Sequence, residues 1–179
     1  MNTGALEPLL LTDGTELLVR PIRPSDREAL GREFARLSPE SRRRRFLAPK
    51  PKLSETELRR LTEIDHRSHE ALVAIDPETR RGVAVARYAG HAGEPGRSEF
   101  AITVTDDWQG RGIGSALSRR LLSRACEEGV LVLEAIALAD NRAALALLRG
   151  LGFRVRSFDG GTAELRLRLG PAAPYAKAA

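Results

Sequence analysis

The chain has 179 residues, of which 42% are hydrophobic and 30% are charged, and this composition fits one globular domain with a substantial core. A single cysteine excludes an intramolecular disulfide, and the three scattered histidines form no zinc-binding pattern. The formal net charge of +5 favours polyanionic partners, which include nucleic acid and any cofactor that carries several phosphates.

The sequence shows no apolar run near the roughly 20 residues that a transmembrane helix needs. Its first residues lack the charged start and the long apolar stretch of a signal peptide. We therefore expect a cytoplasmic protein without a membrane partner. We also expect one domain over residues 1–170, followed by a flexible tail over residues 171–179.

In the N-terminal half, residues 16–22 form a short β-rich run. Ser25 to Glu28 matches a capping box, in which a serine and a glutamate side chain satisfy free N–H groups at a helix start. Ser38-Pro39 predicts the start of a second helix, with proline in its first turn. Ser54 to Glu57 is another capping box and predicts a third helix.

The C-terminal half alternates strand and helix patterns. A strand, a glycine-rich loop and an amphipathic helix occupy its centre, at residues 97–105, 109–114 and 113–129. A hairpin is predicted before them, from residues 71–75 with 83–88. After them come a strand at 130–138, a helix at 141–151 and a second hairpin from residues 153–158 with 162–169. The order predicts an α/β domain whose central sheet is mixed.

The loop from Gln109 to Gly114 has the composition of a phosphate-binding turn. Gly110, Gly112 and Gly114 remove Cβ atoms at alternate positions, so backbone N–H groups are open to an anion. The next helix adds its positive N-terminal end. The sequence lacks the Gly-Lys-Ser/Thr of a Walker loop, and the glycine spacing differs from the dinucleotide fingerprint. A tight turn without a ligand is the alternative.

Two motifs in a fixed order resemble those of the GCN5-related N-acetyltransferases. Gln109-x-x-Gly112-x-Gly114 is similar to that family's acetyl-CoA motif. Asn141-x-x-Ala144-x-x-Leu147, followed by Leu151-Gly152-Phe153, is similar to its asparagine helix and Gly-Phe turn. The resemblance covers nearly the whole chain and implies the family's mixed sheet with helices around it, in which a splayed strand pair forms the acetyl-CoA cleft.

The resemblance also implies positions for acetyl-CoA, the expected co-substrate. Three strand residues would line the pantetheine arm, a run of loop residues would hold the pyrophosphate, and the asparagine helix would lie beside the thioester. In this sequence these are, in turn, Ile102, Thr103 and Val104; Gln109, Gly110, Arg111, Gly112, Ile113, Gly114 and Ser115; and Asn141, Ala144 and Leu147.

The transfer of an acetyl group to an amine needs a base, because a free lysine amine titrates near 10.4 and is protonated at neutral pH. Glu99, on the strand before the loop, is the predicted catalytic base, and the family commonly places a glutamate there. Glu134 on the next strand is the second candidate. Many relatives have a tyrosine one residue after the leucine that matches Leu147, but this chain has Leu148, so a general acid is missing from that position.

The N-terminal half, from Leu37 to Asp65, resembles bacterial protein-lysine acetyltransferases that modify acyl-CoA synthetases. A protein lysine is therefore the first candidate acceptor, and a small amine is the second. A nucleic-acid-binding module is third and leaves the asparagine motif without a purpose, so no nucleic-acid partner is expected. The run Arg42 to Arg45 is interpreted either as a solvated helix turn or as a contact for an acidic protein surface. A monomer or a homodimer is expected, with no bound metal.

Overall fold

The computed structural model describes residues 5–170. In this part of the chain, strands and helices follow in the order β1 Glu7–Leu10, β2 Glu16–Pro21, η1 Pro24–Asp26, α1 Arg27–Arg36, α2 Pro39–Phe46, α3 Glu55–Thr62, β3 His69–Ile75, β4 Gly82–Gly90, β5 Arg97–Val104, η2 Asp106–Trp108, α4 Ile113–Glu127, β6 Val132–Leu138, α5 Arg142–Gly150, β7 Arg154–Asp159 and β8 Thr162–Arg168. The predicted tail at residues 171–179 lies outside the described residues.

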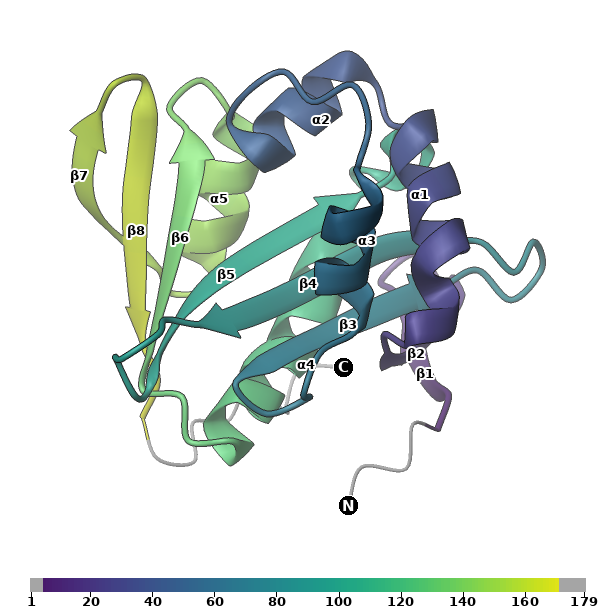
Figure 1. The fold of residues 1–179 in the computed structure, drawn as a ribbon, viewed down its shortest axis with the longest axis horizontal. Helices are drawn as coiled ribbons and strands as arrows, with labels where there is room; N and C mark the ends of the chain where they lie inside the picture. The colour runs from purple at the N-terminus through teal and green to yellow at the C-terminus, as the bar shows by residue number, and fades with distance from the viewer. Residues whose placement is uncertain (1–4, 171–179) are drawn as a thin grey trace.

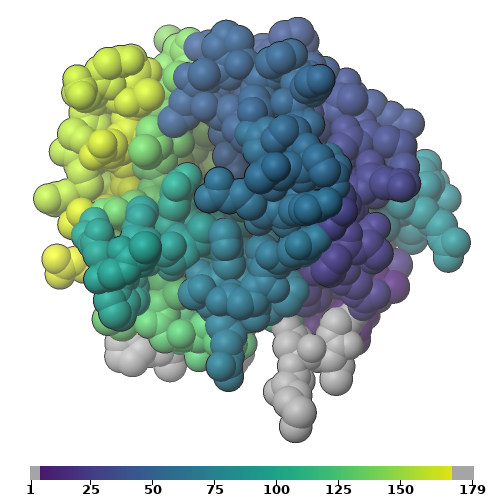
Figure 2. Space-filling model, in the orientation of Figure 1, coloured from purple at the N-terminus to yellow at the C-terminus, as the bar shows by residue number. Residues whose placement is uncertain are grey.

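The described strands form one sheet in the order β1-β2-β3-β4-β5-β6-β8-β7. Its neighbours pair antiparallel, apart from the parallel pair of β5 and β6. Helices α1, α2 and α3 lie on one face of the sheet and α4 lies on the other (Figure 1). In the space-filling view the segment from α1 to α3 covers much of the sheet on its own face (Figure 2). The predicted mixed sheet is confirmed.

The parallel pair separates after a short contact. β5 pairs with β6 only from Arg97 to Glu99, against Val132 to Glu134. Beyond that point β5 continues to Val104 with β4 as its partner, while β6 continues to Leu138 with β8 as its partner. The edges of β5 and β6 that face each other are therefore unpaired beyond Glu99, which is the splayed strand pair that the family resemblance implies.

Helix α4 closes the core on the face opposite α1 to α3. Its side chains Leu117, Leu121 and Ala125 are completely buried against the sheet, as the predicted helical spacing requires. Burial of each leucine stabilises the fold by about 1.5–3 kcal/mol. The helix is also held by charge, because Arg124 Nη1 lies 3.1 Å from Oε2 of Glu70 on β3, and the side chain of Glu70 is only 2% exposed. Helix α4 is therefore held to the sheet by both apolar packing and an ion pair.

Two local predictions differ from the structure. Strand β1 was not predicted: it is four residues long at the sheet edge and contains Pro8 beside consecutive leucines, so it shows no alternation. The capping box at Ser25 was wrong, because the Asp26 carboxylate instead accepts a hydrogen bond from Arg23 N at 2.8 Å and α1 begins at Arg27. The capping box at Ser54 is confirmed.

Candidate active site

A cleft of about 540 Å³ lies where β5 and β6 separate. Its walls come from β5, the glycine-rich loop with the start of α4, the inner edge of β6, helix α5 and helix α2. The residues that line it are Ser41, Arg44, Arg45, Leu47, Glu99, Phe100, Ala101, Ile102, Thr103, Val104, Trp108, Gln109, Gly110, Gly112, Ile113, Gly114, Ser115, Ala135, Ile136, Ala137, Asn141, Ala143, Ala144, Ala146, Leu147 and Leu148. Apart from Arg111 and the second candidate base, Glu134, every residue that the sequence predicted for the site is in this lining.

The side chain of Arg111 turns away from the cleft. Its Nη2 donates to Thr15 Oγ1 at 2.6 Å, and its Nε donates to Asp13 Oδ2 at 3.2 Å. The guanidinium also stacks over the ring of Trp108, 4.3 Å from the ring centroid. The side chain therefore braces the loop against the turn between β1 and β2 and does not line the cleft.

The loop presents backbone N–H groups at the start of α4. Gly110 and Gly112 have φ of 78° and 82°, a backbone conformation that L side chains rarely adopt. The first hydrogen bond inside the helix runs from Ala116 N to Gly112 O at 3.1 Å. The N–H groups of Ile113 and Gly114 precede this bond, so they are available to an anion at the positive end of the helix.

Gly114 differs from the two other loop glycines because it lies in the helix and has no positive φ. A Cβ atom at this position would lie 3.3 Å from Leu147 Cδ2 on α5. The absence of a side chain therefore lets α4 approach α5 closely. The sequence interpretation gave all three glycines the same purpose, and the structure separates them into two that set the loop conformation and one that sets helix packing.

The asparagine of the second motif caps a helix. Asn141 is the N-cap of α5, and its Oδ1 accepts a hydrogen bond from Ala144 N at 3.1 Å. Its side chain is 9% exposed and lies in the wall of the cleft. Asn141 thus fixes the start of α5 beside the splayed strands, where Ala144 and Leu147 complete the apolar wall.

The two candidate bases have different surroundings. Glu99 lies in the cleft lining at the last position of β5 that pairs with β6, and its carboxylate has no hydrogen bond or ion pair with any described residue. Glu134 lies outside that lining, and its Oε1 accepts from Arg97 at 2.8 Å and from Arg166 at 2.7 Å. The hydrogen bond from Arg97, more than any other contact, lowers the pKa of Glu134 from its ordinary value. The structure therefore leaves Glu99 as the candidate base.

A proton donor is not evident in the cleft. Leu148 is buried in its wall, and the described residues that line the cleft include no tyrosine, cysteine or histidine. The histidines lie elsewhere: His66 Nδ1 contacts Glu70 Oε1 at 2.8 Å, His91 Nε2 lies 3.6 Å from Glu134 Oε2, and His69 is half-buried on β3. Residues 5–170 also contain no group of acidic, histidine or cysteine side chains that could hold a metal ion.

Helix α2 forms a wall of the cleft that the sequence did not predict, and the arginine run lies on this helix. Arg42 donates to the carbonyl oxygens of Ala35, Leu37 and Pro51 at 2.8, 2.9 and 2.8 Å, so it holds the chain on both sides of α2 together. Arg43 Nη2 reaches Asp140 Oδ2 at 3.1 Å, beside α5. The run therefore has specific internal contacts and is more than a solvated turn.

The start of α2 is tied to the glycine-rich loop through Asp106. The carboxylate of Asp106 accepts from Ser38 N and Ser38 Oγ, both at 2.9 Å, and from Ser41 Oγ at 2.6 Å. Gln109 Nε2 in turn donates to Ser41 Oγ at 3.3 Å and to Val104 O at 3.1 Å. Helix, loop and strand are thus joined in one hydrogen-bonded network at the edge of the cleft.

Comparison with known proteins identifies this arrangement. Residues 16–154 match the acetyltransferase (GNAT) domain. The chain belongs to the GNAT acetyltransferase family. Members of this family are N-acetyltransferases with acetyl-CoA as co-substrate, and the splayed strands, glycine-rich loop and asparagine helix are the expected site.

Similar proteins come from several bacteria. The chain is 38% identical over 146 residues to acetyltransferase PA5475 of Pseudomonas aeruginosa, a match that covers 80% of this chain and 77% of that protein. It is 32% identical over 145 residues to acetyltransferase Pat of Mycolicibacterium smegmatis, over 81% of this chain but only 43% of that protein. The crystal structure of the GNAT domain of S. lividans PAT superposes with a TM-score of 0.85 at 30% identity, over 92% of this chain and 97% of that one.

No described helix of this GNAT chain is both long enough and apolar enough to cross a membrane. The nucleic-acid hypothesis would use residues 114–129, which include most of α4, as a recognition helix. In the structure α4 has its apolar side buried in the core and Arg124 bound to Glu70. The family membership and this packing both favour the acetyltransferase hypotheses over the nucleic-acid hypothesis.

Proposed function

We propose that this GNAT chain transfers the acetyl group of acetyl-CoA to the side-chain amine of a protein lysine, for example in an acyl-CoA synthetase, with Glu99 as general base. The observation that carries the proposal is the position of Glu99: its carboxylate lies in the cleft at the point where β5 leaves β6, without a partner among the described residues.

The proposed binding mode uses the backbone of the cleft. The pyrophosphate would accept hydrogen bonds from N–H groups between Gly110 and Ser115, at the start of α4. The pantetheine amides would pair with the free edge of β5 at residues 102–104, which has no partner strand on the β6 side. This places the thioester beside Asn141 and Leu147, within the same cleft as Glu99.

The proposed reaction is a direct attack of the neutral amine on the thioester carbon. Glu99 takes a proton from the ammonium group, directly or through a water molecule, since the free ammonium titrates near 10.4. The C–N bond forms, the C–S bond breaks, and the electron pair leaves with the sulfur. The nitrogen then gives up a second proton to water, which leaves the neutral amide. Because the described lining of the cleft contains no tyrosine, cysteine or histidine that could donate a proton, the thiolate departs unassisted or takes a proton from water.

Two observations support a protein lysine as the acceptor. The N-terminal half resembles protein-lysine acetyltransferases in sequence, and the GNAT domain of S. lividans PAT matches nearly the whole chain. An acetyltransferase for a small amine is the second candidate. A phosphinothricin acetyltransferase from Sinorhizobium meliloti is among the similar structures, but its 22% identity supports the shared fold alone.

The acceptor is tested by incubation of the protein with isotopically labelled acetyl-CoA in a bacterial lysate, followed by mass spectrometry of proteins and of small molecules. We expect label on lysine side chains of one or a few proteins, and labelling slower by about 10² or more when Glu99→Gln replaces the wild type. Label confined to small amines would reject the protein-lysine proposal. The absence of any enzyme-dependent label, together with no acetyl-CoA binding in calorimetry, would reject the acetyltransferase function itself.

A further inference from the structure

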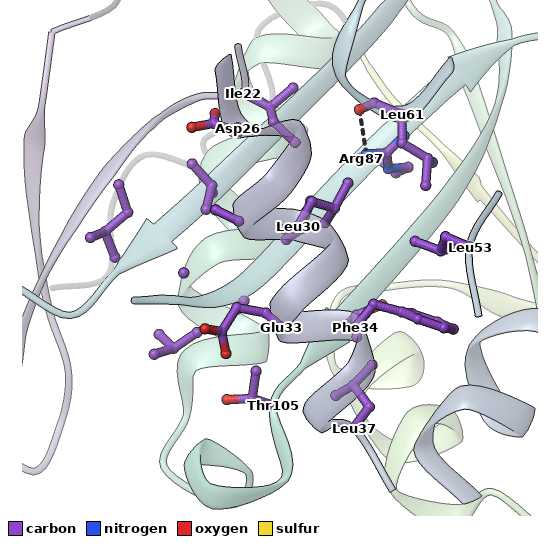
Figure 3. A pocket seen from close by; sticks show the side chains of 18 of the residues that line it. Ile22, Asp26, Leu30, Glu33, Phe34, Leu37, Leu53, Leu61, Arg87 and Thr105 are labelled. Carbon is purple, nitrogen blue, oxygen red and sulfur yellow. Dashed lines mark hydrogen bonds between the residues drawn. The ribbon is translucent and has the colours of Figure 1, made fainter. Parts of the chain in front are cut away.

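A second cavity, of about 140 Å³, lies between helices α1 to α3 and the sheet (Figure 3). Most of its wall is apolar, with Leu30, Phe34, Leu53 and Leu61 among the side chains that point into it (Figure 3). The wall also contains charged side chains, and the balance among these charges is unusual for the interior of a protein.

The acidic side chains in this wall already have cationic partners. Asp26 accepts two hydrogen bonds of 2.7 Å from Arg20. Glu33 Oε2 accepts from Arg81 Nη2 at 2.9 Å. These carboxylates therefore do not compensate the other cations of the cavity.

Three arginines in the wall form no ion pair with any described residue, and one of them, Arg80, is exposed. The other two are Arg87 on β4, which is buried, and Arg45 on α2, which is half-buried. Arg87 is only 7% exposed, and the hydrogen bond it makes is from Nη2 to Leu61 O at 3.0 Å (Figure 3). Arg45 is half-buried, with its guanidinium over the ring of Phe46, 5.0 Å from the centroid. Most N–H donors of these two side chains are thus left for a ligand.

The two guanidinium groups also act on each other. Burial, and after it the charge of Arg45, lowers the pKa of Arg87 to about 9. Burial lowers the pKa of Arg45 as well, and the negative charge of Glu99 partly opposes this. Arg87 remains cationic at neutral pH, and a buried cation without a counter-ion is costly. An anion in the cavity would remove this cost.

The cavity adjoins the cofactor cleft. Arg45 and Thr103 line both of them, and Glu99 lies in the cleft close enough to influence Arg45. An anion bound between Arg45 and Arg87 therefore lies on the same side of the sheet as the carboxylate that we assign as the base.

We propose that this cavity binds a carboxylate group of the acceptor, held by Arg87 and Arg45 while Glu99 takes the proton from the acceptor's amine. The inference rests on the proposed function and adds a chemical requirement to its substrate. A carboxylate fits better than a phosphate because the space is small and mostly apolar, and a monoanion loses less hydration. The planar fork of a guanidinium matches the two oxygens of a carboxylate.

The test compares acceptors that differ only in a carboxylate and its neutral amide. One arm uses free amino acids and their carboxamides, and the other uses peptides with lysine beside glutamate or beside glutamine. We expect wild type to favour the carboxylate member by about tenfold or more in kcat/KM in one arm, which identifies the source of the carboxylate. Arg87→Met should bring the ratio close to one with the KM for acetyl-CoA unchanged, and Arg87→Lys should retain part of it.

Equal rates for both members in both arms would overturn the inference and leave the proposed function intact. Persistence of the preference in both Arg87→Met and Arg45→Met would also overturn it. If the enzyme acetylates none of these acceptors, a binding measurement replaces the kinetic one. Butyrate should raise the Tm of wild type at constant ionic strength, whereas butyramide should not. The absence of this shift would count against the cavity as a carboxylate site.

The stability of Arg87→Met without ligand separates a binding role from a structural one. If Arg87 is retained for a ligand, its removal eliminates a buried, uncompensated charge and should raise the Tm of the free protein. If Arg87 serves only to hold the Leu61 carbonyl, the variant should be less stable or fail to fold, and either result would contradict the proposal.

Discussion

Glu99 offers the sharpest prediction at the scale of one residue. Glu99→Gln keeps the size of the side chain but removes its ability to accept a proton. We expect kcat to fall by about 10²–10⁴, the range typical of general acid–base catalysis. The Kd for acetyl-CoA should stay nearly constant, because the loop and β5 make the proposed cofactor contacts through their backbones. Steady-state kinetics and calorimetry measure the two quantities.

Glu134→Gln is the matched control, since Glu134 pairs with Glu99 in the parallel register of the sheet. Its carboxylate is bound to Arg97 and Arg166 and lies outside the cleft lining. The control should lower the Tm modestly and leave kcat within a few-fold of wild type. A larger loss of kcat in the control than in Glu99→Gln would show that Glu134, and not Glu99, is the base.

Gly112 carries a second prediction at this scale. Gly112→Ala places a Cβ atom on a residue with φ of 82°, which costs about 1–2 kcal/mol unless the loop changes conformation. If the loop shifts, its N–H groups no longer converge, and we expect acetyl-CoA to bind about tenfold more weakly, equivalent to about 1.4 kcal/mol. Gly93→Ala imposes similar strain at φ of 78° in a loop outside the cleft, so it should affect stability but not affinity.

At the scale of an element, helix α4 depends on the pair between Arg124 and Glu70. Arg124→Met would leave the Glu70 carboxylate buried with His66 as its remaining side-chain partner. Loss of one member of a buried pair costs about 3–5 kcal/mol, and we expect a destabilisation near the lower end in urea titrations. Arg119→Met, at an exposed position of the same helix, should change stability by less than about 0.5 kcal/mol. Equal effects would show that the pair contributes nothing specific.

The elements that the sequence predicted well are those with a strong local pattern. Alternation defined β5, glycine and helical spacing defined the loop and α4, and Ser54 with Glu57 defined the start of α3. The misses have weak or competing local patterns. Strand β1 is a short edge strand that alternation does not mark. Before α1, the Asp26 carboxylate accepts a hydrogen bond from Arg23 N in the preceding turn, and Ser25 does not cap the helix.

At the scale of the whole molecule, the sequence predicted those residues of the site that lie in a local motif, and it did not predict those that tertiary packing brings in from elsewhere. Glu99, Asn141 and the loop glycines lie in motifs that can be recognised along the chain, and the structure brings them together in one cleft. Ser41 and Arg45 enter the cleft from a distant helix, and no local pattern encodes that contact. An arginine run is usually solvated, and the internal partners of this one depend on tertiary packing.

Asp106 links the start of α2, the helix that carries Arg45, to the glycine-rich loop that is proposed to hold acetyl-CoA, and its loss should affect both. Asp106→Asn weakens the bonds from Ser38 and Ser41, so we expect higher KM values for acetyl-CoA and acceptor and a loss of about 1 kcal/mol in stability.

The stabilisation by Asp106 should also depend on pH. Although partial burial opposes the shift, hydrogen bonds from Ser41 and Ser38 lower the pKa of Asp106 from 3.8. Its carboxylate therefore stabilises the fold at pH values above 3.8, and this contribution disappears as the pH falls through the lowered pKa. The difference in unfolding free energy between wild type and Asp106→Asn should accordingly shrink below pH 3.8, as measured by urea titration across the acid range. A difference that is constant with pH would show that the carboxylate charge does not hold α2 to the loop.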